Sequence, residues 1–265
     1  MGALSESRLA GAVVVTGGGS GIGRAAALAV AERHAAVAVL DVHADAAEAV
    51  AADARERGAP AVAGLACDVR DEGSVVAALA AGVEQLGAVR GLVACAGIGD
   101  GGLVHELPVE TWADVLATNL TGTFIACKHV FAHMLEHGEG GSIVCASSPW
   151  GEVSAPGGAS AYSASKGGVS ALVRSLALDY ARHGVRVNAI VPGATETPLM
   201  WAGMAADDIP PARERIGDQL AVGRLARPDE IAAGVTWLLS DAASYVTGSH
   251  LVVDGGLLAR ASIES

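Results

Sequence analysis

Short apolar runs alternate with longer amphipathic stretches along almost the whole of this 265-residue chain. The apolar runs have the length of strands, and the amphipathic stretches have the length of helices. When strands and helices alternate, right-handed crossovers place the helices on both faces of a parallel sheet. The alternation therefore predicts an α/β fold, a doubly wound three-layer sandwich around a seven-stranded parallel sheet.

The same pattern predicts the individual elements. Strands are expected at Ala12–Thr16, Ala36–Leu40, Ala61–Cys67, Gly91–Cys95, Ser142–Ala146, Arg186–Val191 and His250–Val253. Helices are expected near Ile22–Arg33, Ala44–Arg57, Glu72–Leu86, Val109–His137, Tyr162–His183 and Asp229–Leu239. The pattern contains no linker, so residues 1–265 are predicted to form one domain.

The longest stretch without a periodic pattern runs from about residue 193 to residue 226 and contains Pro198, Pro210 and Pro211. Long loops inside compact domains often serve as lids or binding segments. We therefore expect a substrate lid at 193–226, with a surface loop of no such function as the alternative.

The formal net charge is −12 at pH 7, and Lys and Arg do not cluster. Nucleic acids and anionic membranes both bind clustered cations, so neither is an expected partner. Residues 1–10 lack an apolar targeting core, and no apolar run reaches membrane-spanning length. Cys67, Cys95, Cys127 and Cys145 stand far apart, which is typical of thiols in a reducing compartment. These features favour a cytoplasmic protein.

A glycine-rich turn follows the first expected strand, with the sequence Thr-Gly-Gly-Gly-Ser-Gly-Ile-Gly at 16–23. Glycines there let the backbone approach a pyrophosphate, and the N-terminus of the next helix offers unpaired N–H groups and a positive dipole. Asp41 closes the second strand 18 residues after Gly23. At about that spacing a carboxylate reaches the ribose hydroxyls of a dinucleotide, so the pattern favours a Rossmann-type site.

Asp41 also predicts which dinucleotide binds. A 2′-phosphate would lie against its carboxylate at a cost on the order of several kcal/mol. Neither Ser20 nor Val42 supplies a compensating cation, and His43 is the one nearby residue that could weaken the preference. NAD(H) is therefore the expected cofactor, rather than NADP(H).

The segment Ala-Tyr-Ser-Ala-Ser-Lys-Gly-Gly at 161–168 places Tyr162 four residues before Lys166. In a helix these positions lie on one face, so both side chains can reach the same small volume. A free phenol has a pKa of about 10 and is seldom ionised near neutral pH. A cation at about 4 Å and an effective dielectric of about 20 stabilises a phenolate by about 4 kcal/mol. Taken alone, such a pair is more often a solvated helix face.

Over nearly its whole length the sequence resembles the short-chain dehydrogenase/reductase family. The likeness rests, in the family's order, on TGGGSGIG, Cys67-Asp68-Val69, ACAG at 94–97, Asn119, Ser147-Ser148, Tyr162-x-x-x-Lys166, Pro192-Gly193 and Asp254-Gly255-Gly256. The resemblance implies an NAD-dependent oxidoreductase that interconverts a secondary alcohol and a ketone by hydride transfer. It also implies a homotetramer or homodimer.

The resemblance further implies residue roles. Tyr162 is the expected general acid/base, assisted by Lys166. Ser148 matches the hydroxyl that binds the substrate oxygen, and Asn119 matches the residue that holds a water beside the lysine. Dinucleotide contacts are expected from Gly17, Ser20, Gly21, Ile22, Gly23, Asp41, Asp68, Val69, Ala96, Gly97, Asn119, Tyr162, Lys166, Pro192, Gly193, Thr195 and Thr197.

The segment Ala94-Cys95-Ala96-Gly97 departs from the Asn-Asn-Ala-Gly that is frequent in relatives. The departure removes side-chain amides that would brace the central sheet, but it removes no catalytic group. Two rival functions stay open: an epimerase or dehydratase of the same broad group, and a catalytically inactive regulator that binds a dinucleotide.

Three histidines, His129, His133 and His137, recur every four residues on one expected helix. This spacing can present a metal site, but we expect no metal and favour a stripe at or beside a subunit interface. The segments expected around the substrate contain Trp150, Val153, Met200, Trp201 and Met204. They suggest an apolar or cyclic alcohol or ketone, with Trp201 alternatively covering the core or an interface.

Overall fold

The computed structural model describes residues 9, 11–99, 102–154 and 158–259. These residues form a sheet of seven strands in the order β3-β2-β1-β4-β5-β6-β7, and every neighbouring pair is parallel. The strands are β1 (Ala12–Thr16), β2 (Val37–Asp41), β3 (Val62–Ala66), β4 (Val89–Ala94), β5 (Gly141–Ala146), β6 (Val185–Pro192) and β7 (His250–Val253). The predicted fold class is therefore confirmed, with strand bounds that differ by two residues or fewer.

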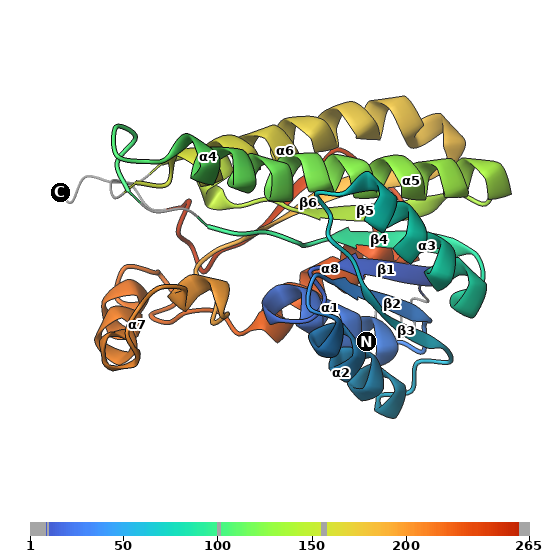
Figure 1. Ribbon diagram of the computed structural model, residues 1–265, viewed down its shortest axis with the longest axis horizontal. Helices are drawn as coiled ribbons and strands as arrows, with labels where there is room; N and C mark the ends of the chain where they lie inside the picture. The colour runs from blue at the N-terminus through green and yellow to red at the C-terminus, as the bar shows by residue number, and fades with distance from the viewer. Residues whose placement is uncertain (1–8, 10, 100–101, 155–157, 260–265) are drawn as a thin grey trace.

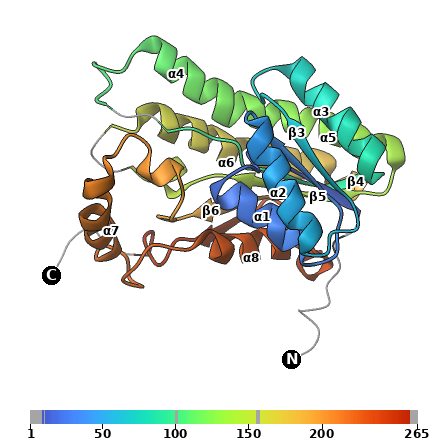
Figure 2. The same ribbon diagram turned by 60° about the horizontal axis from the view of Figure 1, so that its bottom comes forward.

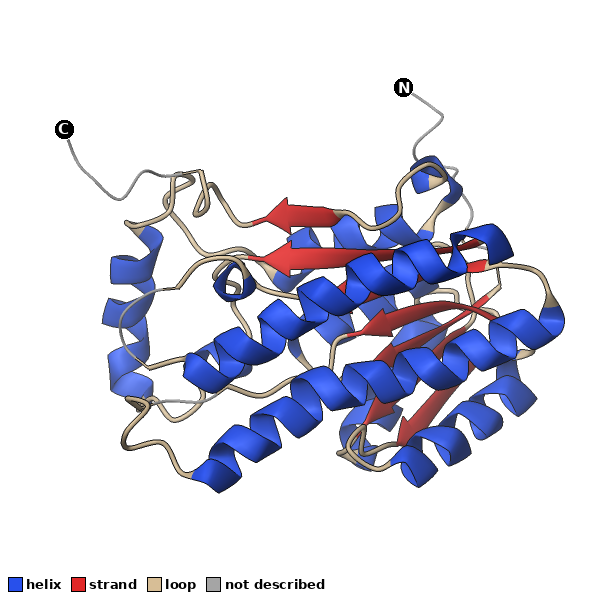
Figure 3. Ribbon diagram, turned by 90° about the horizontal axis from the view of Figure 1, so that it is seen from above, coloured by secondary structure: helices blue, strands red, loops and turns tan. Residues whose placement is uncertain are grey.

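Helices cover both faces of the sheet (Figure 1). On one face lie α3 (Glu72–Leu86), α5 (Gly122–His137) and α6 (Ser160–Tyr180), and on the other lie α1 (Gly21–Ala31), α2 (Ala44–Glu56) and α8 (Pro228–Leu239). Alternate residues of β1 divide between the two layers: Ala12 and Val14 pack toward α5, and Val13 and Val15 pack toward α1. Figure 3 shows the long helices of the first face lying over the strands.

This division follows from strand geometry, because successive side chains point to opposite faces of a sheet. With helices on both faces, apolar residues follow one another along the strands, as AVVV in β1 and VAVL in β2 illustrate. No helix in the described part of the chain combines the length and the apolar character that a membrane span needs.

The helix expected at Val109–His137 has those bounds but not a uniform geometry. It consists of α4 (Val109–Leu116), a π-helical turn at Ala117–Thr121 and α5. A π-turn inserts one extra residue into the hydrogen-bonding ladder and often marks a functional position. Here the buried residue of the turn is Asn119.

The expected lid contains a helix that the sequence pattern did not reveal. Helix α7 spans Ile209–Gly217 and begins with Pro210 and Pro211 in its first turn. Proline is tolerated there because those N–H groups have no helical partner. We had treated both prolines as marks of a loop, and that interpretation of 209–217 was wrong. Figures 1 and 2 show α7 standing apart from the helices that cover the sheet.

Candidate active site

A cleft of about 820 Å³ lies at the carboxyl ends of the strands and spans both sides of the boundary between β1 and β4. The strand order reverses at that boundary, and this is where open α/β sheets bind ligands. The lining includes every predicted catalytic and dinucleotide-binding residue except Asn119, which is fully buried.

The glycine-rich turn forms one wall of the cleft. Gly17 has a φ of +64°, and a Cβ there would lie 2.6 Å from the Cα of Ala96 on the neighbouring strand end. A Cβ on Gly23, in the first turn of α1, would lie 2.1 Å from the carbonyl oxygen of Gly17. The turn thus has room for backbone only, and it leads directly into the N-terminus of α1 at Gly21. Such a cradle fits a pyrophosphate.

Asp41 lies at the end of β2 and lines the same cleft. Its carboxylate accepts hydrogen bonds from the backbone N–H of Gly19, at 2.9 Å, and of His43, at 3.0 Å. The bond from Gly19 attaches the acid to the glycine-rich turn, and the bond from His43 fixes it to the start of its own loop. The carboxylate is therefore held in place before any ribose reaches it.

Asp68 and Val69 follow β3 and also line the cleft. Two nitrogens of the Arg70 guanidinium donate hydrogen bonds to the Asp68 carboxylate, Nη2 at 2.7 Å and Nε at 3.0 Å. The hydrogen bonds from Arg70 lower the pKa of the Asp68 carboxyl below its ordinary value. Arg70 itself lines the cleft, and the sequence analysis did not include it because its link to Asp68 appears only in the folded loop.

Tyr162 and Lys166 both extend from the first two turns of α6 into the cleft. Lys166 is 4% exposed, and its Nζ donates a 2.7 Å hydrogen bond to the carbonyl of Ala146 at the end of β5. The same nitrogen lies 5.6 Å from the centre of the Tyr162 ring. The helical spacing therefore does bring the phenol and the ammonium to one volume.

The two serines after β5 have different surroundings. The hydroxyl of Ser147 donates to the carbonyl of Lys166 at 3.2 Å and lies 2.8 Å from the hydroxyl of Ser170, so it binds β5 to α6. The Ser148 oxygen accepts a 3.2 Å hydrogen bond from the N–H of Trp150. Its hydroxyl hydrogen is not used in that bond, which leaves Ser148 able to donate into the cleft.

Asn119 occupies the π-turn behind the cleft. Its Oδ1 accepts from the N–H of Ile98 at 2.8 Å, and its Nδ2 donates to the carbonyl of Ile98 at 2.9 Å and to the hydroxyl of Ser165 at 3.0 Å. The side-chain amide is thus engaged on both its oxygen and its nitrogen. The main-chain carbonyl of Asn119 accepts a 2.7 Å hydrogen bond from the hydroxyl of Thr123.

The segment after β6 forms the opposite wall. The N–H of Gly193 donates to the carbonyl of Val253 at 3.0 Å, and the hydroxyl of Thr195 donates to the carbonyl of Gly193 at 2.9 Å. The Thr197 oxygen accepts a 3.2 Å hydrogen bond from the N–H of Met200. A Cβ on Gly21 would lie 3.2 Å from the methyl carbon of Thr197, so this wall approaches the start of α1 closely.

The substrate end of the cleft is mostly apolar. Of the five residues suggested for it, Trp150 and Met200 line the cleft. The Trp201 indole N–H donates instead to the Glu196 carboxylate at 3.0 Å. Several lining residues carry no motif in the sequence: Ile98, Leu199, Ile216, Gln219, Leu220 and Leu257. Three of these belong to α7 or follow it directly, so recognising Pro-Pro as a helix start would have found them.

Each of the three histidines of α5 has a different polar partner, and the rings of His133 and His137 lie 4.1 Å apart, centre to centre. His129 Nε2 lies 2.8 Å from Glu72 Oε1, and His133 Nε2 accepts a 3.0 Å hydrogen bond from the N–H of Val89. His137 Nδ1 lies 2.9 Å from the carbonyl of His133. Burial lowers the pKa of His133, and the neighbouring His137 lowers it further.

Comparison with known proteins defines the class to which this fold and site belong. The profile of a family described as "Enoyl-(Acyl carrier protein) reductase" matches residues 17–258. The chain belongs to the short-chain dehydrogenase/reductase family. It is an oxidoreductase that acts on hydroxyl groups with a nicotinamide dinucleotide cofactor.

Two curated relatives and one solved structure illustrate the similarity. The cis-4-hydroxycyclohexanecarboxylate dehydrogenase of Sinomonas cyclohexanicum is 44% identical over 247 residues, covering 93% of this chain and 96% of the relative. The D-threitol dehydrogenase of Mycolicibacterium smegmatis is 42% identical over 256 residues, covering 95% and 94%. A short-chain type dehydrogenase/reductase from Mycobacterium marinum superimposes with a TM-score of 0.89 at 31% identity, covering 96% of this chain and 98% of that one.

Proposed function

We propose that this enzyme is an NAD-dependent dehydrogenase that interconverts an apolar or cyclic secondary alcohol and its ketone, with Tyr162 as general acid/base. The observation that carries the proposal is the pairing of the Tyr162 phenol with the buried Lys166 ammonium inside a cleft that also holds the glycine-rich turn and Asp41. The proposal concerns the residues that do the chemistry, the cofactor preference and the substrate class.

Lys166 stabilises the phenolate form of Tyr162. At the 5.6 Å between Nζ and the ring centre, and at an effective dielectric of about 20, the Coulomb attraction is about 3 kcal/mol. This attraction would favour transfer of a proton between the phenol and a substrate hydroxyl. The hydrogen bond from Nζ to Ala146 keeps the ammonium at that position.

Ser148 and Asn119 complete the set. The free hydroxyl hydrogen of Ser148 can donate to the substrate oxygen and stabilise the charge that develops on it. Asn119 links the strand end at Ile98 to Ser165 of α6, which lies next to Lys166. Its main-chain carbonyl would hold the water through which Lys166 exchanges protons with solvent.

The lining fits a nicotinamide dinucleotide, which supplies a hydride acceptor when it binds. The turn around Gly17 would cradle the pyrophosphate, Asp41 would accept hydrogen bonds from the adenosine ribose, and Lys166 would donate to the other ribose. We propose NAD rather than NADP, because the Asp41 charge would face the 2′ position of a bound dinucleotide while Arg70 is engaged by Asp68. An Arg in that state is not free to neutralise a 2′-phosphate.

The substrate class follows from the lining. Among the described lining residues, the charged side chains are Asp41, His43, Asp68, Arg70 and Lys166, so beyond Lys166 the charges belong to the cofactor end. The substrate end presents Ile98, Trp150, Leu199, Met200, Ile216 and Leu220. This composition supports an uncharged ring or branched alcohol, in contrast to the carboxylate in the name of the 44% identical relative.

We also propose that copies of this chain associate through the outer face of α4, α5 and α6. Trp112, Phe124 and Leu178 lie on these helices and are 38%, 48% and 83% exposed. Exposed apolar side chains of this size often lie at interfaces. Light scattering coupled to size exclusion distinguishes a dimer or tetramer from a monomer.

We also propose a cytoplasmic location, which the four free cysteines support. Fractionation of the native host tests it.

Deuterium transfer tests the proposed reaction. The purified enzyme is incubated with NAD⁺ and a panel of cyclohexanols, acyclic alcohols and polyols that carry deuterium on the alcohol carbon. We expect deuterated NADH and a ketone, with the highest kcat/KM for ring alcohols. An epimerase or dehydratase would retain its cofactor without net NADH, and an inactive regulator would bind NADH and transfer nothing. Highest activity on polyols would refute the substrate class alone.

A further inference from the structure

Backbone pairing joins the two ends of the expected lid. Thr195 and Ala226 form a parallel bridge, with hydrogen bonds of 2.9 Å from the N–H of Glu196 to Ala226 and from the N–H of Ala226 to Ala194. The intervening chain therefore leaves the body of the protein and returns to it at the same point. Helix α7 is the far part of this excursion (Figures 1 and 2).

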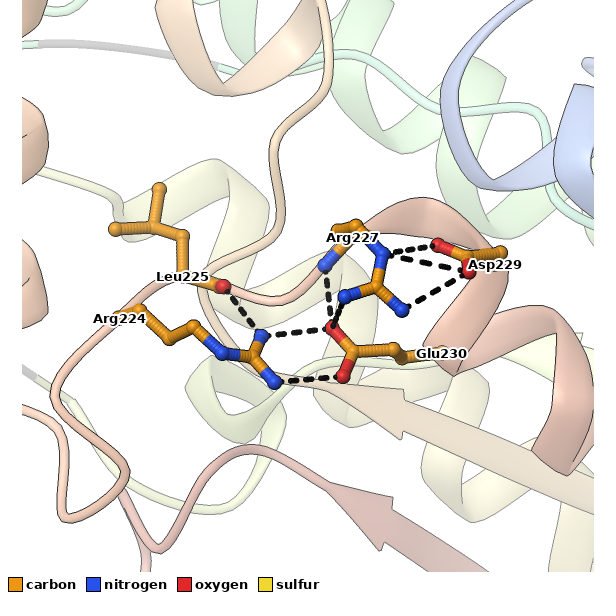
Figure 4. Close-up of polar contacts among 5 residues, drawn as sticks. All are labelled: Arg224, Leu225, Arg227, Asp229 and Glu230. Carbon is orange, nitrogen blue, oxygen red and sulfur yellow. Dashed lines mark hydrogen bonds and ion pairs between the residues drawn. The ribbon is translucent and has the colours of Figure 1, made fainter.

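Charged groups strengthen the end of this base at which the chain returns to the body of the protein. The Arg224 guanidinium binds both oxygens of Glu230, at 2.7 and 2.8 Å, and the N–H of Arg227 donates to the same carboxylate at 2.8 Å (Figure 4). Glu230 lies in the first turn of α8, which packs against α1 and the sheet. The base of the lid is thus attached to a rigid helix, and the position of α7 depends on other contacts.

A second carboxylate fixes α7 itself. Glu196 forms an ion pair with Arg213 of α7, in which Nε donates to Oε1 and Nη2 donates to Oε2 at 3.2 Å. Oε2 also accepts the Trp201 indole N–H at 3.0 Å, and the Arg213 guanidinium lies 5.6 Å from the centre of the Trp201 ring. Bidentate pairing sets both the distance and the direction of the guanidinium. We call Glu196, Trp201 and Arg213 the lid clamp.

The clamp and the cleft share one helix. Ile216 lies three residues after Arg213, which is about one helical turn, and Ile216, Gln219 and Leu220 line the substrate end of the cleft. In contrast, the glycine-rich turn and Asp41 contact none of the three clamp residues in the bonds described above. A shift of α7 would therefore change the substrate end and leave the dinucleotide end in place.

We infer that Arg213 is a positioning residue for the alcohol substrate: its ion pair with Glu196 holds α7 so that Ile216 and Leu220 complete the substrate pocket. The inference rests on the proposed function, since it assigns the alcohol to this end of the cleft. It gives Trp201 a role other than contact with substrate or cover for the core or an interface.

The test is steady-state kinetics of three variants. Arg213→Ala removes the clamp, Arg213→Lys keeps a charge that can reach Glu196, and Arg57→Ala removes a comparably exposed pair with Glu32, remote from the cleft. We expect Arg213→Ala to raise the KM for the alcohol about fivefold, which corresponds to about 1 kcal/mol. The KM for NAD⁺ should stay within about twofold of the wild-type value. Arg213→Lys should recover part of the alcohol KM, and Arg57→Ala should have no effect.

Three results would overturn the inference: an unchanged alcohol KM in Arg213→Ala, an equal rise in both KM values, or a similar rise in Arg57→Ala. If Arg213→Ala does not fold, Glu196→Gln is judged by the same criteria, since its amide keeps an acceptor for Trp201. Failure of the proposed function itself gives a different result, because the wild-type enzyme would then produce no NADH from any alcohol.

Discussion

Replacing Asp41 with Asn should relax the preference for NAD over NADP. The substitution removes the charge while conserving the shape of the side chain. One of the two backbone hydrogen bonds, from Gly19 or from His43, loses its acceptor. That loss affects binding of both cofactors alike, because both would use the same turn. The ratio of the two kcat/KM values therefore isolates the effect of the charge.

The size of the change follows from Coulomb's law. For a carboxylate about 5 Å from a phosphate charge, with an effective dielectric between about 80 and about 20, the repulsion is about 1 to 3 kcal/mol. The NAD/NADP ratio of kcat/KM should fall about 5-fold to 150-fold. Asp45→Asn in the first turn of α2 is the matched control, and its ratio should equal that of the wild type. An Asp41→Asn ratio within twofold of wild type would refute the argument.

Three further predictions concern the turn, the lid base and the thiols. Gly17→Ala should weaken NADH binding at least tenfold by fluorescence titration, because its Cβ meets the Ala96 backbone, while Gly82→Ala, with ordinary contacts in α3, should leave it unchanged. Hydrogen bonds from the Arg224 guanidinium lower the pKa of Glu230 from 4.5 to about 2. The contribution of this carboxylate to stability is therefore complete above pH 4.5 and is lost as pH falls toward 2. Glu230→Gln should flatten the profile of Tm against pH in that window, and an unaltered profile would contradict the assignment. Burial raises the pKa values of Cys67 and Cys95 to about 11, so iodoacetamide at pH 8 should label them slowly in the native chain and rapidly after unfolding, whereas fast native labelling would count against that burial.

The sheet could be predicted because each strand carries a strong local signal. The apolar runs of β1 and β7 have the predicted bounds, and the others differ only at their ends. A run such as AVVVT is too short for a helix when glycines follow it, so its length and its flanking residues both indicate a strand. The parallel direction of the strands then follows from the helical crossovers between them.

The lid helix could not be predicted in the same way. In α7 the sequence IPPARERIG is short and has few large apolar residues, and of its nine residues Ala212 and Gly217 are buried. Periodicity detects helices that pack against a core. The π-turn at Asn119 could not be predicted either, because one inserted residue changes the hydrogen bonding of the helix without changing the amino-acid composition of the segment.

The residues of the candidate site also fall into those that the sequence could predict and those that it could not. Gly17, Asp41, Tyr162 and Lys166 could be placed from motif spacing, and the structure brings them to one cleft. Arg70 could not be assigned, because its bond to Asp68 depends on the conformation of the loop after β3. The partner of Arg70 is only two residues away in the sequence, but the spacing alone does not show that the loop turns the guanidinium onto the carboxylate.

Paired measurements on Tyr162→Phe test the central claim, that the Tyr162 hydroxyl beside Lys166 transfers the substrate proton. The substitution removes one oxygen and leaves the ring near Nζ. The variant should bind NADH with a Kd within twofold of the wild type and lose kcat by at least about a thousandfold, the upper range for a general acid/base. A Tyr162→Phe enzyme that keeps a tenth or more of the wild-type kcat would contradict the account.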